Sequence, residues 1–151
     1  MAKIDKATGG TTALPAQQHG KFAVLEKVVD LSVTALPSTD VMAIFNLPAG
    51  VLPLGLGWKV TTADSVLAGT IDVGLYKSSD SAVVDVDGLK NELPIGEAGS
   101  GYAAPAAANE ITEAMFVGLA HGAGGAGATF NDAVIEFALA VVDLTAPASA
   151  E

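Results

Sequence analysis

Two segments near the middle of the chain alternate strictly between apolar and polar residues, and this pattern constrains the fold more than any other feature. Trp58–Thr62 (WKVTT) and Ile71–Leu75 (IDVGL) share this alternation. Successive side chains of a β-strand point to opposite faces, so each segment predicts a strand with one apolar face. Residues 63–69 (ADSVLAG) connect them and contain turn-forming Asp, Ser and Gly. We therefore expect two adjacent antiparallel strands around Trp58, the only tryptophan of the chain.

The same alternation, bounded by turn residues, predicts further strands on both sides of this pair. The last of them is Thr129–Leu144, where alternation of apolar residues favours a strand over the helix that Ala, Glu and Leu would permit. Residues 87–110 are punctuated by Gly and Pro and predict a long loop, with one helical turn near Leu89–Leu93. The other expected strands are Phe22–Thr34, Val41–Phe45, Ala82–Val86 and Glu113–His121.

Seven or eight strands with no sustained helical period predict an all-β sandwich or barrel. Residues 1–20 are small, polar and aperiodic, and we expect them to form a flexible N-terminal arm. The arm is either a disordered terminus or a segment that orders against a neighbouring subunit. Residues 21–145 are expected to form the sandwich domain and 146–151 a C-terminal tail.

Several strands carry small residues at positions that we expect to point outward. They indicate either that an outer face is covered at close range, as in a subunit contact, or that small side chains are merely tolerated there. These residues are Gly74, Gly118, Ala138 and Ala140.

The charge and composition of the chain argue against several classes of partner. All 7 basic residues are lysines, and the formal net charge is -10. An acidic chain without arginine is a poor candidate for binding nucleic acid, although its charge would help it to dock onto a basic surface. The absence of cysteine excludes disulfides and thiolate metal sites. The first residues lack the apolar segment of a signal peptide, and no run of about 20 apolar residues predicts a membrane span.

One glycine-rich stretch imitates a dinucleotide-binding loop. Gly122, Gly124 and Gly127 have the G-x-G-x-x-G spacing, and Asp143 lies where a ribose-binding acid would be. Only Ala128–Ala133 separates the last glycine from the next strand, which leaves no room for a crossover helix. We therefore interpret residues 122–127 as a flexible loop and expect no cofactor site.

A second stretch has a composition that would suit a cation. Asp80, Asp85 and Asp87, together with Gly88, could supply oxygen ligands to Ca²⁺. Their spacing differs from that of an EF-hand loop, and a solvated acidic turn is the favoured interpretation.

The two histidines, His19 and His121, have no partner at metal-ligand spacing. His121 is the one plausible base in the expected domain, but no G-x-S-x-G elbow accompanies it. Acidic residues are spread singly along the polar faces, so no glycosidase pair is indicated. We expect no catalytic, metal-binding or cofactor-binding residue, and hence no enzymatic activity.

Three segments of the chain are similar to head decoration, or cement, proteins of marine and cyanobacterial tailed phages. They are Phe45–Gly50 (FNLPAG), Gly57–Ala63 (GWKVTTA) and Gly69–Gly74 (GTIDVG), followed by an acidic loop at Asp85–Gly88 (DVDG). The resemblance covers residues 22–144. It implies a jelly-roll-like β-sandwich that binds the outer surface of the capsid and stabilises the phage head. It further implies the major capsid protein as partner, self-association as a homotrimer, and location in the virion.

Two other functions stay open at the level of sequence. One is a tail, baseplate or fibre component of the same kind of virus. The other is a carbohydrate-binding β-sandwich module, in which aromatic side chains would stack on sugars. The candidates for such stacking are Trp58, Tyr76 and Tyr102, of which Trp58 is expected in the core.

Overall fold

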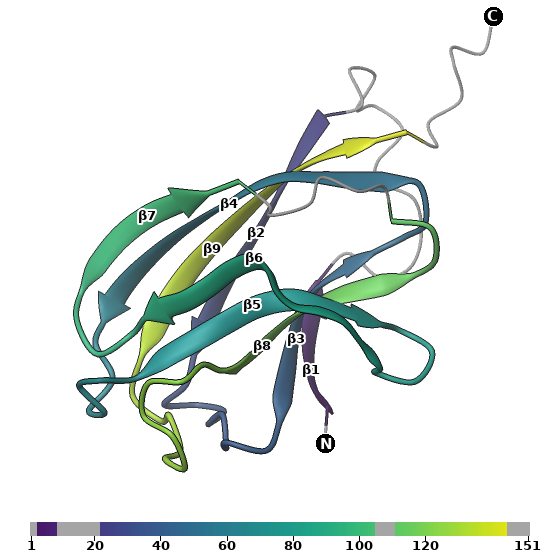
Figure 1. Cartoon of the computed structure of the whole chain (residues 1–151). Helices are drawn as coiled ribbons and strands as arrows, with labels where there is room; N and C mark the ends of the chain where they lie inside the picture. The colour runs from purple at the N-terminus through teal and green to yellow at the C-terminus, as the bar shows by residue number, and fades with distance from the viewer. Residues whose placement is uncertain (1–2, 9–21, 105–110, 145–151) are drawn as a thin grey trace, which may run out of the picture.

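The computed structural model of the chain describes residues 3–8, 22–104 and 111–144. These residues form nine strands and no helix, arranged as two sheets packed face to face (Figure 1). The expected all-β sandwich is thereby confirmed. The strands are β1 (Lys3–Thr8), β2 (Phe22–Asp30), β3 (Val41–Leu47), β4 (Val51–Thr62), β5 (Thr70–Lys77), β6 (Val83–Pro94), β7 (Gly99–Ala103), β8 (Met115–His121) and β9 (Val134–Asp143).

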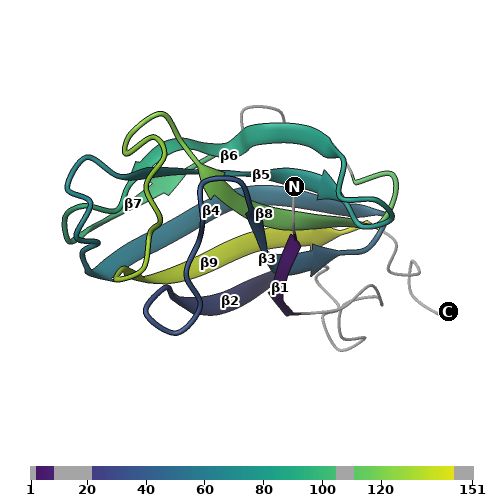
Figure 2. The ribbon, with the colours of Figure 1, turned by 90° about the horizontal axis from the view of Figure 1, so that it is seen from below.

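The strand order is that of a jelly roll with one added strand. One sheet has the order β2-β9-β4-β7 and the other β1-β3-β8-β5-β6 (Figures 1 and 2). The pairs β2·β9, β3·β8, β4·β7 and β5·β6 are all antiparallel and nest inside one another along the chain. This nesting is what results when a long hairpin rolls up into two sheets, so consecutive strands usually change sheet. β1 is the added strand, which pairs in parallel with β3 and brings that sheet to five strands.

The hydrophobic core lies between the two sheets. In β8, Met115, Val117 and Leu119 enter this core, while Phe116 points to the opposite face of its sheet. The expected alternation of β9 is also confirmed, because its inward side chains are all buried. The β9 residues in the core are Ile135, Phe137, Leu139 and Val141.

The expected pairing of the two central strands is wrong. β4 and β5 both form, but they belong to different sheets: β4 pairs with β7 and β9, and β5 pairs with β6 and β8. The connection at residues 63–69 crosses from one sheet to the other instead of making a hairpin. Alternation identifies a strand and its inward face, but it carries no information on which strand lies beside it.

The buried side chain of Asp64 fixes this crossing, a role that no motif in the sequence indicates. Its side chain is 2% exposed. One carboxylate oxygen accepts the Val66 N–H at 3.1 Å, and the other accepts the Asp132 and Ala133 N–H groups at 3.0 and 3.1 Å. The carboxylate therefore ties the β4–β5 connection to the residues that precede β9.

The expected loop at residues 87–110 is also wrong over most of its length. Residues 87–94 continue β6, and β7 follows at 99–103, so no helical turn forms near Leu89–Leu93. Part of β6 pairs irregularly with β5, and Glu92 has a left-handed φ of 53°. These irregularities interrupt the period-two pattern, which explains why the sequence predicts this strand only as far as Val86. Residues 105–110 lie outside the described part.

The N-terminal region differs in part from the expectation. Lys3–Thr8, within the predicted arm, forms β1, whereas the rest of the arm and the C-terminal tail lie outside the described residues. β2 ends at Asp30, four residues before the expected end, because the Asp30 side chain accepts the Ser32 N–H in a turn. Val33 is consequently exposed instead of facing the core.

Candidate interaction surface

The outer face of the five-stranded sheet is closed over β3, β8 and β5, whereas Val83, Val84 and Val86 of the edge strand β6 are exposed. Val41, Ala43, Tyr76 and Phe116 lie on the closed part and are at most 1% exposed. The Tyr76 and Phe116 rings stack with centroids 5.2 Å apart, and the Lys3 ammonium lies 4.6 Å from the centre of the Phe116 ring. These contacts give the sheet a second, smaller apolar cluster on the side away from the main core.

Glycines allow this closed face to pack tightly. A Cβ on Gly118 would lie 2.7 Å from the Tyr76 ring and from a Val41 methyl group. A Cβ on Gly74 would lie 2.2 Å from the carbonyl oxygens of Asp85 and Val86. Both predicted outward glycines are therefore covered at close range, and the groups that cover them belong to the same chain.

Burial of the Tyr76 side chain has an electrostatic consequence. Desolvation, and then the negative charge of Asp72, raise the pKa of the Tyr76 phenol to about 12. Its hydroxyl is buried without a hydrogen-bond partner within the described part of the chain. The residue therefore acts here as an aromatic filler, not as an acid or base.

The outer face of the four-stranded sheet is open and apolar. Phe22, Val24 and Val28 project from β2 and are 58–62% exposed, and Tyr102 on β7 is 68% exposed. Such residues are usually buried on a sandwich, and several of them on one sheet face mark a binding surface. We call this surface, made by the outward residues of β2, β9, β4 and β7, the open face.

A groove runs along the middle of the open face. It has a volume of about 300 Å³, and its floor includes Gly57 of β4 and Ala138 of β9. The groove exists because these two residues, which pair across the strands, carry almost no side chain. A Cβ on Gly57 would have only the Ala138 carbonyl oxygen, at 3.8 Å, within 4 Å. The space above Gly57 is thus unfilled by the chain itself.

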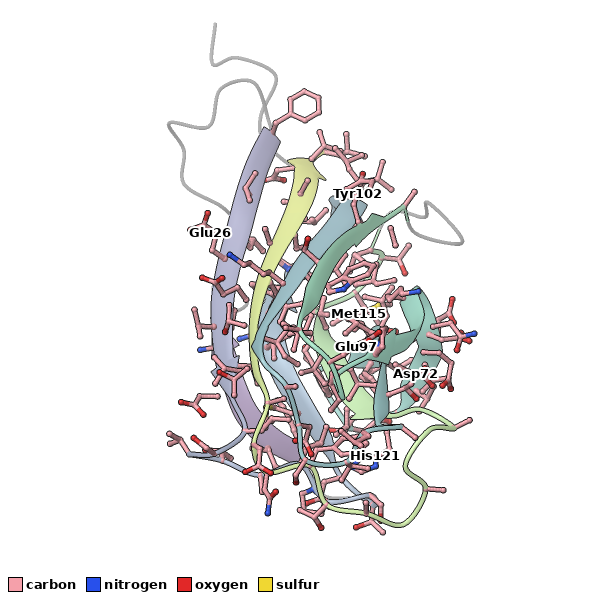
Figure 3. The ribbon with its side chains drawn as sticks, turned by 90° about the vertical axis from the view of Figure 1, so that its left-hand side faces the viewer. Glu26, Asp72, Glu97, Tyr102, Met115 and His121 are labelled. Carbon is pink, nitrogen blue, oxygen red and sulfur yellow. The ribbon has the colours of Figure 1, made fainter. Side chains whose placement is uncertain are left out.

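Charged side chains stand on the walls of the groove. Glu26 rises from β2, while Lys59 of β4 and Glu136 of β9 lie directly opposite each other in the sheet. Figure 3 shows Glu26 pointing away from the other sheet. The open face therefore combines exposed apolar residues with charges of both signs.

The predicted outward residues Ala138 and Ala140 belong to this surface. Each is partly buried on the outer side of β9, with Gly57 and Gly55 as their partners on β4. The Tyr102 ring lies over Gly55, where a Cβ would come within 2.0 Å of the tyrosine hydroxyl. The alternation in the sequence identifies the two alanines as outward residues but does not predict the groove, because only the pairing of β4 with β9 brings the small residues together.

The glycine-rich stretch forms a loop and not a dinucleotide site. It connects β8 in one sheet to β9 in the other, with no helix between them. Gly122 donates its N–H to the Thr70 carbonyl at 2.9 Å, and Gly125 and Gly127 have φ values of 75° and 80° that favour glycine. Asp143 is buried at the end of β9.

Glu92 holds this glycine loop in place. Its carboxylate accepts the Ala123 N–H and the Thr70 hydroxyl, both at 2.5 Å. These hydrogen bonds, led by the one from Ala123, lower the pKa of Glu92. Asp72 lies close by and accepts the Glu92 N–H at 2.8 Å, and burial is the main cause that raises the Asp72 pKa. The hydrogen bonds among Thr70, Asp72, Glu92 and Ala123 therefore hold β5, β6 and the glycine loop together.

The acidic candidates for Ca²⁺ do not converge. Asp80 lies in the turn after β5, where its carboxylate accepts the Ala82 N–H at 3.0 Å. Asp85 and Asp87 lie on β6, so the expected acidic turn is wrong for these two residues. No group of three or more potential metal ligands occurs among the residues that the structure describes.

His121 is placed structurally at the end of β8, near one end of the sandwich (Figure 3). Its Nε2 lies 2.8 Å from the Leu36 carbonyl oxygen, and its ring stacks on Phe130 with centroids 3.9 Å apart. Because a carbonyl only accepts, Nε2 carries the proton. His19 lies outside the described residues.

The aromatic candidates for sugar stacking do not form a platform. Trp58 packs against the main core with its ring 5.4 Å from the Lys90 ammonium, and Tyr76 is buried on the other sheet. Of the three, Tyr102 alone is exposed. A single exposed ring is a weak basis for a carbohydrate site.

The chain shares its fold with chains found in phage capsids. It superposes on a chain of the capsid of Ralstonia phage GP4 with a TM-score of 0.65 and 19% identity, covering 94% of this chain and 98% of that one. It superposes on a chain of the capsid asymmetric unit of cyanophage Pam1 with a TM-score of 0.54 and 18% identity, covering 89% and 96%. The fold is one that phage capsids contain.

No protein-family model and no curated protein matches the sequence. The likeness is therefore one of backbone architecture, which extends over nearly the whole length of both chains in each comparison. Fold alone does not fix function, and the open face is the feature of this chain that points to what the fold is used for.

Proposed function

We propose that the chain is a structural protein of a phage virion that binds the outer capsid surface and stabilises the head. The observation that carries the proposal is the likeness to the chain of the Ralstonia phage GP4 capsid, because it spans both chains almost completely. The proposed partner is the major capsid protein, and the proposed state of the chain is a homotrimer.

The surface of the molecule supports a role in binding over a role in catalysis. Four of its exposed apolar residues, Phe22, Val24, Val28 and Tyr102, lie on the open face and not in an enclosed cleft. The candidate residues for chemistry that the structure describes are held in structural contacts, as His121 and Asp80 illustrate. A net charge of -10 favours docking onto a basic surface.

Stabilisation of a head would follow from mass action. A protein that binds the assembled shell but not its dissociated subunits shifts the equilibrium toward the shell by its own binding free energy. Each copy contributes this free energy once, so many weak contacts add up over a particle. No chemical step is required of the bound protein.

The test is reconstitution on heads that lack this chain. The purified chain is added to such heads, unbound protein is removed by sedimentation, and the temperature at which the heads release DNA is measured. We expect saturable binding and a higher release temperature than with an unrelated acidic protein of similar size. Absence of binding, or binding without a rise in release temperature, would contradict the proposed function. Electron microscopy of gold-labelled chain on whole virions distinguishes the head from the tail.

A further inference from the structure

We propose that the open face is a self-association surface, in which the β2 edge of one copy inserts into the groove of a second copy. This inference rests on the proposed function, which includes a homo-oligomer, and names the surface through which the copies bind one another. It is tested on the free protein without particles, so the two proposals fail separately.

The shape of the face is self-complementary. On β2, Val24, Glu26 and Val28 form a raised edge, because alternate side chains of a strand project to the same side. Next to this ridge, Gly57 and Ala138 leave the groove of about 300 Å³. The ridge follows β2, and the groove lies between side chains of the neighbouring strands β9 and β4, so both extend along the strand direction. The ridge of a second copy can therefore lie lengthwise in the groove.

The charges of the face are complementary in the same arrangement. A ridge seated in the groove places Glu26 of one copy above Gly57 of the other. Lys59 is two residues along β4 from Gly57, on the same face, and is exposed. Glu26 of one copy then comes within reach of Lys59 of the next. This pair opposes the repulsion between two chains that each carry a net charge of -10.

A second copy explains the face better than a basic shell surface would. A basic partner would be favoured by a face of acidic residues, whereas this groove carries Lys59 beside Glu136 and Glu26. Mixed charges around an apolar strip are what a surface needs to bind its own copy. Every copy carries both a ridge and a groove, so copies joined head to tail can close into a ring, as the proposed homotrimer requires.

The experiment measures assembly of the full-length chain by sedimentation velocity over a wide range of concentrations. Gly57→Gln fills the groove without an internal clash, since the space above Gly57 is open. The matched control is Gly99→Gln on β7, where a Cβ meets nothing within 4 Å. Gly99 pairs with inward-facing Val60, so its side chain lies on the side of the sheet away from the groove. We expect wild type and Gly99→Gln to assemble alike, and Gly57→Gln to stay monomeric with an unchanged thermal midpoint when compared as monomers.

A charge swap tests the proposed geometry directly. Glu26→Lys and Lys59→Glu should each raise the midpoint concentration of assembly about tenfold, and the double variant should restore it. Overturning results are a wild-type chain that is monomeric throughout, Gly57→Gln that assembles normally, or a double variant no better than the singles. If Gly57→Gln assembles normally but no longer binds heads, the shell occupies the open face; the present inference then fails and the proposed function stands.

Discussion

Replacement of Asp64 by Asn tests the contact that joins the two sheets at the β4–β5 crossing. The carboxylate has two oxygens and accepts three backbone N–H groups, from Val66, Asp132 and Ala133. Asparagine offers one oxygen, and its amide nitrogen donates. Whichever way the amide turns, at least one backbone N–H then faces another donor and loses its acceptor.

The magnitude follows from the number of hydrogen bonds lost. A hydrogen bond to a charged group contributes about 1.5–3 kcal/mol, and a buried donor without a partner adds a further cost. With the oxygen turned toward Asp132 and Ala133, the contact to Val66 is the only one lost, and we expect Asp64→Asn to cost about 2–3 kcal/mol. For a domain of this size that corresponds to a thermal midpoint lower by about 4–12 °C.

The assay is guanidinium unfolding at one fixed protein concentration, since self-association would raise the apparent stability. Asp80→Asn is the control: Asp80 is exposed and accepts one N–H, from Ala82, which the oxygen of asparagine can also accept. We expect the control to change stability by less than about 0.5 kcal/mol. If Asp64→Asn matched the control, the three contacts would contribute nothing to folding and the proposed clamp would be refuted.

Three further predictions concern the closed face and the glycine loop. Hydrogen bonds lower the folded pKa of Glu92, so its contribution to stability is present above its unfolded pKa and is lost as pH falls through the folded pKa. In Glu92→Gln the thermal midpoint, measured from pH 7 to pH 3, should therefore fall less steeply with decreasing pH than in the wild type. Gly118→Ala should cost about 1–3 kcal/mol in denaturant unfolding, and Gly74→Ala more, because its Cβ would meet backbone instead of side chains; an equal cost would contradict this order. In Tyr102→Phe, where Tyr76 is the sole tyrosine, absorbance at alkaline pH should show phenolate formation with its midpoint near pH 12, and a midpoint near pH 10 in the folded chain would show that the phenol is not buried.

The sequence predicted strands best where the side chains on both faces are buried, or where every second side chain is buried in the core. β8 and β9 are of this kind, and their inward residues were assigned correctly. Burial selects apolar side chains at every second position in such strands, so the pattern is a direct imprint of packing. The all-β class followed from the repetition of that pattern.

Strand partners and irregular strands could not be predicted in the same way. The residues between β4 and β5 would suit a hairpin as well as a crossing, and what decides the crossing is Asp64 meeting Asp132 and Ala133. These groups are about seventy positions apart in the sequence. The first part of β6 agrees with the strand expected at Ala82–Val86, but residues 87–94 were not predicted as strand because β6 pairs irregularly with β5. This second part includes Glu92, whose left-handed backbone costs on the order of 1 kcal/mol and is offset by hydrogen bonds.

The sequence predicted the small outward residues but not the groove, because small residues have different roles on the two outer faces. Gly74 and Gly118 sit on the closed face, where the chain itself fills the space that a side chain would need. Gly57 sits on the open face, where that space is empty. In a list of alternating residues these glycines look alike, and tertiary contacts alone separate them.

The contrast between the two faces is also the strongest physical argument for a bound partner. One sheet covers its outer apolar cluster so fully that Phe116 and Ala43 are inaccessible to solvent. The other sheet leaves Phe22, Val24 and Val28 more than half exposed beside an unfilled groove. Burial of each such side chain would contribute about 1.5–3 kcal/mol, so a fold able to close one face gains nothing by leaving the other open unless a second molecule covers it.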